Sequence, residues 1–253
     1  MIDPEILKLV GTFPKISLEE MDSIRLMNRT DTKFIATTYQ LLEFLKAAQG
    51  QYYAQEIEGE RVNPYHTVYL DTPDAAMYTA HHNGRLVRSK VRVRTYLLTG
   101  NTFFEIKNKN NHGRTKKKRI QVPDMEHMPQ QETSEFLHQF TPYYLNDLRP
   151  TIENNFNRIT LVNKEKTERL TIDFDLNFHH LITDERKDMG HLVVIELKRD
   201  GKVSSPAIGI FRDLRVHRAS FSKYCIGSAY TNPGLKRNRF KTKLIKYNKL
   251  TQQ

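Results

Sequence analysis

Several residue types and patterns are scarce in this 253-residue sequence, and each scarcity excludes a class of protein. The one cysteine, Cys225, cannot form an internal disulfide and has no metal-ligand spacing around it, so redox chemistry and structural zinc are not expected. There is no tryptophan, and no apolar run approaches the roughly 20 residues of a transmembrane helix. The first 20 residues carry early acids and no apolar segment of the secretory type. We therefore expect a cytoplasmic protein.

Acidic residues are missing from two stretches of the chain, and this distribution says more than the net charge of +11. Residues 231–253 hold seven basic residues and no acid, so they supply +7 and leave +4 for residues 1–230. From Arg85 to Arg119, twelve basic residues accompany the single acid Glu105. Such a concentrated positive site attracts polyanions through its summed potential, without specifying which polyanion.

What the sequence does contain is a series of strand patterns with few helices. We expect helices at 18–26, 38–49, 74–83, 132–139 and 205–213. We expect strands at 29–35, 66–71, 90–98, 102–109, 115–122, 156–163, 170–178 and 193–199. No repeat or linker divides the chain. We therefore expect one domain over residues 1–230, followed by a basic tail or helix over residues 231–253.

Charged residues in these strands recur at every second position, which places them on one face. Lys90, Arg92 and Arg94 share a face, for example, and valines occupy the other. The same alternation holds for Arg29, Asp31 and Lys33; for Glu105, Lys107 and Lys109; for Thr171, Asp173 and Asp175; and for Glu196 and Lys198. A sandwich would leave such faces as solvated surface. Five such strands together favour an α+β, mainly β fold, an eight-stranded closed antiparallel β-barrel (a tunnel) with a polar lumen and helices packed outside.

Short motifs also follow one another in a characteristic order. They are Arg29-x-Asp31-x-Lys33, Val68 to Asp74, Lys90-x-Arg92-x-Arg94, Glu105-x-Lys107, Arg149-Pro150, Phe156 to Arg158, Asp173-x-Asp175, Ile195 to Lys198 and Phe221 to Tyr224. Each motif alone is common. The ordered series, over about residues 25–230, resembles the VTC domain of polyphosphate polymerases in the triphosphate tunnel metalloenzyme superfamily. Triphosphatase relatives begin with E-x-E-x-K, whereas Arg29 and Asp31 stand here, which resembles the polymerase branch.

The resemblance implies an enzyme that adds the γ-phosphate of ATP to a growing polyphosphate chain and releases ADP. The implied catalytic residues are Lys33, Arg92, Arg94, Lys107, Arg158 and Lys198. The implied phosphate-binding residues are Arg29, Lys90, Glu105, Lys118, Lys223 and Tyr224, with shifts of one residue open around Lys118. Glu196 is implied to bind Mn²⁺ or Mg²⁺. ATP and inorganic polyphosphate are the implied partners, and membrane association through a membrane-protein partner stays open.

Other functions stay open at this level. One is a hydrolase of the same fold that cleaves inorganic triphosphate or nucleoside triphosphates, and another is a non-catalytic module that binds polyphosphate or RNA. An RNA binder should interleave stacking aromatics with its basic residues, and Arg85 to Arg119 has few, so nucleic acid is not the expected partner. A pure anion binder gains nothing from Glu196, although Glu196 could merely pair with Lys198. The basic C-terminal segment could collect polyphosphate, touch lipid or RNA, plug the tunnel mouth, or fray.

Overall fold

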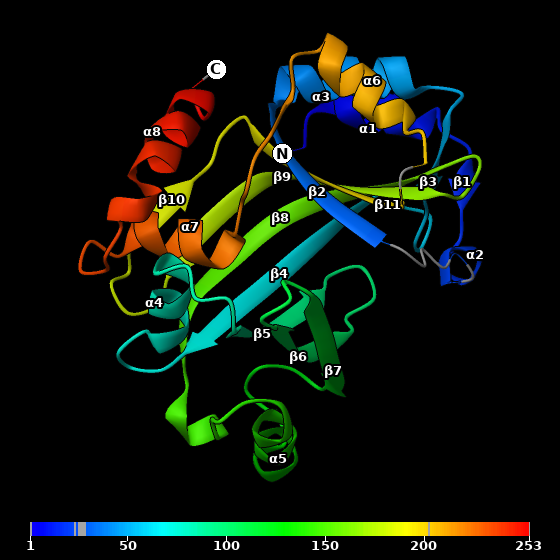
Figure 1. The fold of residues 1–253 in the computed structure, drawn as a ribbon. Coiled ribbons are helices and arrows are strands. Elements are labelled where there is room, and N and C mark those ends of the chain that lie inside the picture. Colours follow the sequence, from blue (N-terminus) through cyan, green and yellow to red (C-terminus); the bar gives the residue numbers. More distant parts are fainter. Residues whose placement is uncertain (1, 23, 25–28, 202, 253) are drawn as a thin grey trace.

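The computed structural model describes residues 2–22, 24, 29–201 and 203–252, and one large sheet dominates it (Figure 1). The strands are β1 (Lys15–Ile16), β2 (Arg29–Thr37), β3 (Tyr52–Gln55), β4 (Val62–Asp71), β5 (Arg88–Tyr96), β6 (Thr102–Lys109), β7 (Thr115–Val122), β8 (Arg149–Asn163), β9 (Glu168–His180), β10 (Arg186–Asp188), β11 (Leu192–Asp200) and β12 (His217–Arg218). The helices are α1 (Pro4–Gly11), α2 (Leu18–Asp22), α3 (Thr38–Ala48), α4 (Ala76–His82), α5 (Gln130–Phe140), α6 (Pro206–Asp213), α7 (Lys223–Thr231) and α8 (Lys241–Leu250), with 3₁₀ turns η1 (Leu145–Asp147) and η2 (Asn238–Phe240). The predicted mainly β, antiparallel fold with helices is confirmed.

The sheet is open, so the prediction of a closed barrel is wrong. Its main path runs β12-β2-β11-β9-β8-β4-β5-β6-β7, and within the described ranges the end strands β12 and β7 do not pair with each other. β7 exposes four consecutive cations, Lys116 to Arg119. Charged residues on an edge strand oppose further pairing. On the other side, β12 takes the free edge of β2 by pairing His217 with Ile35.

The open sheet is nevertheless strongly curled. Lys33 on β2 donates its Nζ to the carbonyl of Phe221 at 3.1 Å, and Lys90 on β5 donates its Nζ to Ser222 Oγ at 2.9 Å. β11, β9, β8 and β4 lie between β2 and β5 in the sheet. Two strands so far apart reach adjacent residues only because the sheet bends around them. We call the inner side of this bend the concave face.

The apolar side of the strands packs against helices outside the bend. α1, α3 and α6 cover one end, where Phe34 meets Phe211 with ring centroids 4.6 Å apart. α5 covers β5 and β6 at the other end, where Leu137 joins the core formed by Val93 and Phe104 (Figure 1). The alternation of charged and apolar residues therefore predicted correctly which side of these strands is buried against helices.

A third core, at one end of the concave face, joins α7 and α8 to β8 and β9. Here the alternation along β9 breaks at Asp175, whose φ is +52° and which sits where the register with β8 shifts. Phe174 consequently joins the core under α1, α3 and α6, whereas Leu176 joins the third core on the other side of the sheet. The prediction that Asp175 shares one regular face with Asp173 is therefore wrong, because a bulge adds a residue to the strand.

The expected strand positions are largely confirmed, and the misses occur at ends and short elements. β6 and β7 match their predicted bounds, but β8 begins at Arg149 rather than at Phe156. α1 and β3 were not predicted, and the part of the predicted helix 18–26 beyond residue 22 lies mostly outside the described residues. None of the described helices is long and apolar enough to cross a membrane.

Candidate functional site

Strand register places the predicted site residues in facing rows on the concave face. Glu196 on β11 lies between Lys33 on β2 and Thr171 on β9. Across the bend, Lys90 on β5 lies opposite Lys107 on β6. The predicted residues found on this face are Lys33, Lys90, Arg92, Arg94, Glu105, Lys107, Arg158, Glu196, Lys198 and Lys223.

Glu105 is committed to two cations. Arg92 donates its Nε to Glu105 Oε2 at 2.7 Å, and Lys117 donates its Nζ to Oε1 at 3.1 Å. The Glu105 side chain is 0% exposed. Burial raises its pKa, but the charges of Arg92, Arg94 and Lys117 outweigh burial and hold the pKa of Glu105 below its usual range. Glu105 therefore fixes cations in place and is not accessible to a ligand.

Asp173 is committed in the same way. The guanidinium of Arg158 grips it with two bonds, Nε to Oδ1 at 2.6 Å and Nη2 to Oδ2 at 2.8 Å. Lys223, the first residue of α7, also donates to Asp173 Oδ2. Burial lowers the pKa of Lys223 to about 7, although Asp173 opposes this shift. Asp173 thus ties α7 to the concave face through its ion pair with Lys223.

Glu196 differs from both of these carboxylates. Its closest cations are Lys198 Nζ at 3.8 Å and Lys33 Nζ at 4.0 Å, and its side chain is 26% exposed. Burial raises the pKa of Glu196, but the charges of Lys33, Lys198 and Lys107 prevail and lower it to about 2. Unlike Glu105 and Asp173, Glu196 is only loosely paired with its cations and stays accessible.

Arg94 and Lys107 are among the predicted cations that form no ion pair with a carboxylate in the part of the chain that the structure describes. Arg94 donates its Nε to Thr67 Oγ1 at 3.1 Å, and its guanidinium lies over the ring of Tyr65 at 5.4 Å. Burial and the charges of Arg92 and Arg158 lower the pKa of Arg94 to about 10. The charge of Arg92, together with burial, lowers the pKa of Lys107 well below its usual range. Both groups therefore gain by meeting an anion.

Lys118 lies on the other side of β7 from the cluster. It pairs with Ile106, and its Nζ lies 5.3 Å from the centroid of the Phe140 ring on α5. Lys117 takes the inner position instead. The shift of one residue reverses the face because side chains alternate along a strand. Ile120, two residues after Lys118 and packed on the α5 core, carried this signal in the sequence.

Tyr224 and Arg29 are the remaining predicted residues. Tyr224 points into the third core, where it stacks on Tyr69 at 5.1 Å and donates its hydroxyl to the buried Asp71. Asp71 also accepts from the backbone N–H groups of Met77 and Tyr78, so this contact holds α7 against α4. Arg29 begins β2 opposite Asp200, and its side chain lies outside the described residues.

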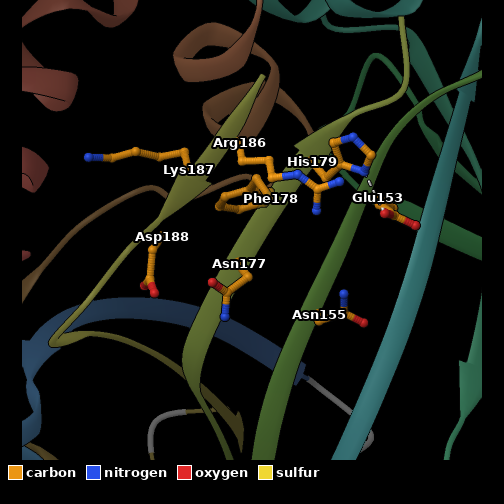
Figure 2. Close-up of a pocket in the computed structure, with 8 residues that line it drawn as sticks. All are labelled: Glu153, Asn155, Asn177, Phe178, His179, Arg186, Lys187 and Asp188. Atoms are coloured by element: carbon orange, nitrogen blue, oxygen red, sulfur yellow. Dashed lines mark hydrogen bonds and ion pairs between the residues drawn. The ribbon is translucent and has the colours of Figure 1, made fainter. Parts of the chain in front are cut away.

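A small cavity of about 160 Å³ lies on the convex side of β8, β9 and β10 (Figure 2). Glu153 accepts from His66 Nε2 at 2.9 Å and from His179 Nδ1 at 2.8 Å. Asn155, Asn177 and Arg186 complete much of the lining. On β8, Glu153 follows Ile152 of the third core, so its side chain lies on the face of the sheet opposite that core and the cations.

Comparison with known proteins agrees with this arrangement. The sequence model of the VTC domain matches residues 28–232. No curated protein matches the chain. HpAC1 from Hippeastrum, a candidate adenylyl cyclase with a dominant triphosphatase activity, is 13% identical with a TM-score of 0.50 over 83% of this chain and 99% of that one. A candidate adenylate cyclase from Bacillus halodurans is 13% identical, with a TM-score of 0.50 over 78% of this chain and 96% of that one.

At this identity, the solved structures show a shared fold alone. The matched range of the family runs from the start of β2 to the end of α7, so it contains every strand and the helix that build the concave face. The chain therefore belongs to the VTC domain family.

Proposed function

We propose that this protein is a polyphosphate polymerase that transfers the γ-phosphate of ATP to a growing polyphosphate chain and releases ADP. The observation that carries the proposal is the contrast among three carboxylates. Glu105 and Asp173 are buried in close ion pairs with arginines, whereas Glu196 stays accessible between Lys33 and Lys198. A face with many cations on which a carboxylate stays accessible suits a chain of phosphates and a metal ion. Membership of the VTC domain family supports the same choice.

The cations can divide the work of phosphoryl transfer. Arg92 and Arg158 are held rigidly by carboxylates, so they present fixed charges to passing phosphates. Arg94 and Lys107, without carboxylate partners in the described ranges, are suited to hold phosphate oxygens directly. Because this reaction depends mainly on positioning and charge stabilisation, such an arrangement supplies most of what catalysis requires.

The reaction needs no protein base. The attacking group is a terminal oxygen of polyphosphate, which is already anionic at neutral pH. A bond forms between this oxygen and the γ-phosphorus of ATP, while the bond from the γ-phosphorus to the β–γ bridging oxygen breaks and ADP leaves. As charge shifts to the bridging oxygen, cations near it stabilise the transition state. We assign this role to Lys33 and Lys198, which flank Glu196.

A divalent metal fits the donor chemistry at Glu196. Mg²⁺ and Mn²⁺ prefer oxygen ligands, and Mg²⁺ typically uses one or two carboxylates with substrate phosphates and water. Within the described ranges no three His, Cys, Asp or Glu side chains converge on a metal position, so nucleotide oxygens would have to supply further ligands. When bound, the ion would neutralise phosphate charge as a Lewis acid. Glu196 would hold it, and Lys33 and Lys198 would keep that carboxylate ionised.

A triphosphatase is the second candidate. The observation that favours it is the shared fold with HpAC1, of which this chain covers 99% and whose dominant activity is that of a triphosphatase. The same cations could hold a triphosphate while water replaces the polyphosphate oxygen as the attacking group. The two reactions differ in their products, since hydrolysis releases orthophosphate and lengthens no chain.

The test is incubation of the purified protein with ATP and Mn²⁺ or Mg²⁺, with products resolved by chain length on a gel. Polyphosphate with ADP, lost in Glu196→Gln and kept in Glu153→Gln, would support the polymerase. The control glutamate lies on the convex side and makes its own hydrogen bonds to His66 and His179. Orthophosphate alone would establish the triphosphatase. Tight polyphosphate binding without turnover would show a binding module instead.

A further inference from the structure

The C-terminal helix presents a surface without acidic residues. Phe240, Leu244 and Tyr247 anchor it in the third core. The exposed basic residues of this segment are Lys236, Arg237, Arg239, Lys241, Lys246 and Lys249. No acid occurs from residue 232 to residue 253, so nothing within this segment neutralises the positive charge.

This surface connects with the concave face through three consecutive residues. Lys243 on α8 donates its Nζ to Ser220 Oγ at 2.5 Å, and Tyr247 donates its hydroxyl to the carbonyl of Ser220 at 3.1 Å. The next two residues, Phe221 and Ser222, receive Lys33 and Lys90 from inside the bend. Lysines from β2, β5 and α8 thus meet on one short segment, which brings cations inside the bend near cations outside it.

The surroundings of His81 on α4 show the same convergence. Its ring lies 6.2 Å from that of Phe240, at the start of the α8 surface. Burial, together with the charges of Lys90, Arg88, Lys243 and Lys109, lowers the pKa of His81 to about 3. These cations come from β5, β6 and α8, so the mouth of the concave face beside α8 is positive on several sides.

We propose that the exposed basic surface of α8 binds the part of the polyphosphate chain that extends outside the concave face. The proposal rests on the proposed function for its ligand, an inorganic polyphosphate too long for the concave face alone. A linear polyanion can follow the series from Lys90 through Lys243 to Lys246 because each phosphate unit carries charge. Binding along this series would keep a growing chain attached between additions.

Two other anionic partners fit the surface less well. A helix that lies on a membrane buries an apolar face, but α8 already buries Phe240, Leu244 and Tyr247 in the protein, and Ile245 is its one large exposed apolar side chain. A single-stranded RNA needs exposed aromatic rings for stacking, and the aromatic residues of this helix and of η2 are the same buried ones. Charge without stacking or insertion groups favours inorganic polyphosphate.

The test compares binding of polyphosphate of about 60 units with binding of tripolyphosphate. In the 253-residue chain, Lys241, Lys246 and Lys249 are replaced together by Gln, which removes the charge and has a helix propensity close to that of Lys. The control replaces three exposed lysines elsewhere, Lys8, Lys164 and Lys166, by Gln. We expect the α8 variant to bind the long chain about tenfold more weakly at low salt and to change tripolyphosphate binding less than twofold. The control variant should match the wild type for both.

Equal losses for both ligands, or no loss for the long chain, would overturn the proposal. So would a loss of binding to phosphatidylserine vesicles or to single-stranded RNA with polyphosphate binding unchanged. The measurement needs no turnover, so its failure can be told from failure of the polymerase. If the wild type makes no polymer and the α8 variant loses only long-chain binding, the binding surface on α8 is supported and the polymerase activity is contradicted. If polymer is made, the variant should yield shorter chains.

Discussion

The two Glu-x-Lys motifs of the concave face look alike in sequence and differ in structure. Glu105 on β6 is fully buried and held by Arg92 and Lys117, whereas Glu196 on β11 is 26% exposed and lies at 3.8 Å or more from its cations. The neighbouring strands differ, because β5 and β7 place Arg92 and Arg119 opposite Glu105, whereas Glu196 has Lys33 on one side and Thr171 on the other. A carboxylate within a cluster of cations can thus be structural or available for a ligand, and its neighbours across the sheet decide which.

The strongest test of this difference removes the negative charge of each glutamate in turn. Glu196→Gln should lower turnover of ATP about a hundredfold or more, because the accessible carboxylate is lost, while polyphosphate binding is kept or strengthened. Steady-state kinetics beside a direct binding assay would check this. If turnover fell less than threefold, Glu196 would not hold the metal, and the contrast with Glu105 would carry no functional meaning.

The matching change at Glu105 should act on stability instead. Glu105→Gln leaves the buried guanidinium of Arg92 without its counter-charge, so we expect a loss of about 3 kcal/mol in the free energy of unfolding. Urea unfolding followed by circular dichroism measures it. Glu196→Gln serves as the control, with an expected change below about 1 kcal/mol, since loosely paired charges contribute little. Similar losses in both variants would contradict the comparison.

A finer test uses two adjacent lysines on β7. Lys117 reaches Glu105 on the concave face, while Lys118 lies over Phe140 outside. Lys117→Gln should weaken polyphosphate binding about threefold to tenfold, and Lys118→Gln less than twofold, because only the first removes charge from the concave face. Titration calorimetry at fixed ionic strength distinguishes them. The reverse order would show that the register of β7 is misassigned.

The smallest expected effect concerns pH and Lys223. Its pKa of about 7 lies below the unfolded value, so the folded protein binds fewer protons here than the unfolded chain above pH 7. The contribution of Lys223 to stability should therefore rise with pH from about 7 towards 10, while its attraction for phosphate declines. Between pH 6 and pH 8.5, the polyphosphate affinity of the wild type should fall as Lys223 loses its proton. In Lys223→Arg, which stays charged, this fall should be smaller by a factor of about two to three. Identical pH profiles would contradict the assignment.

Much of the concave face was predictable because strand alternation is a local property. Lys90, Arg92 and Arg94 share a face whatever the sheet does, and the valines between them identify the buried side. The prediction for Lys118 was wrong because four basic residues in a row conceal the alternation unless Ile120 and Val122 are used to set it. The prediction for Asp175 was wrong because a bulge depends on the partner strand.

By itself, the sequence determined the mainly β class, the order of the strands along the chain and the cationic side of most of them, since these follow from spacing within single strands. Only the tertiary structure decided that the sheet stays open and that Glu105 is buried in ion pairs while Glu196 remains accessible. It also decided that Lys243 of α8 lies beside the segment that Lys33 and Lys90 reach from the concave face. Each of these depends on which residues from distant segments meet. Side chains that meet across a curled sheet are set by register and bending, which no local pattern encodes.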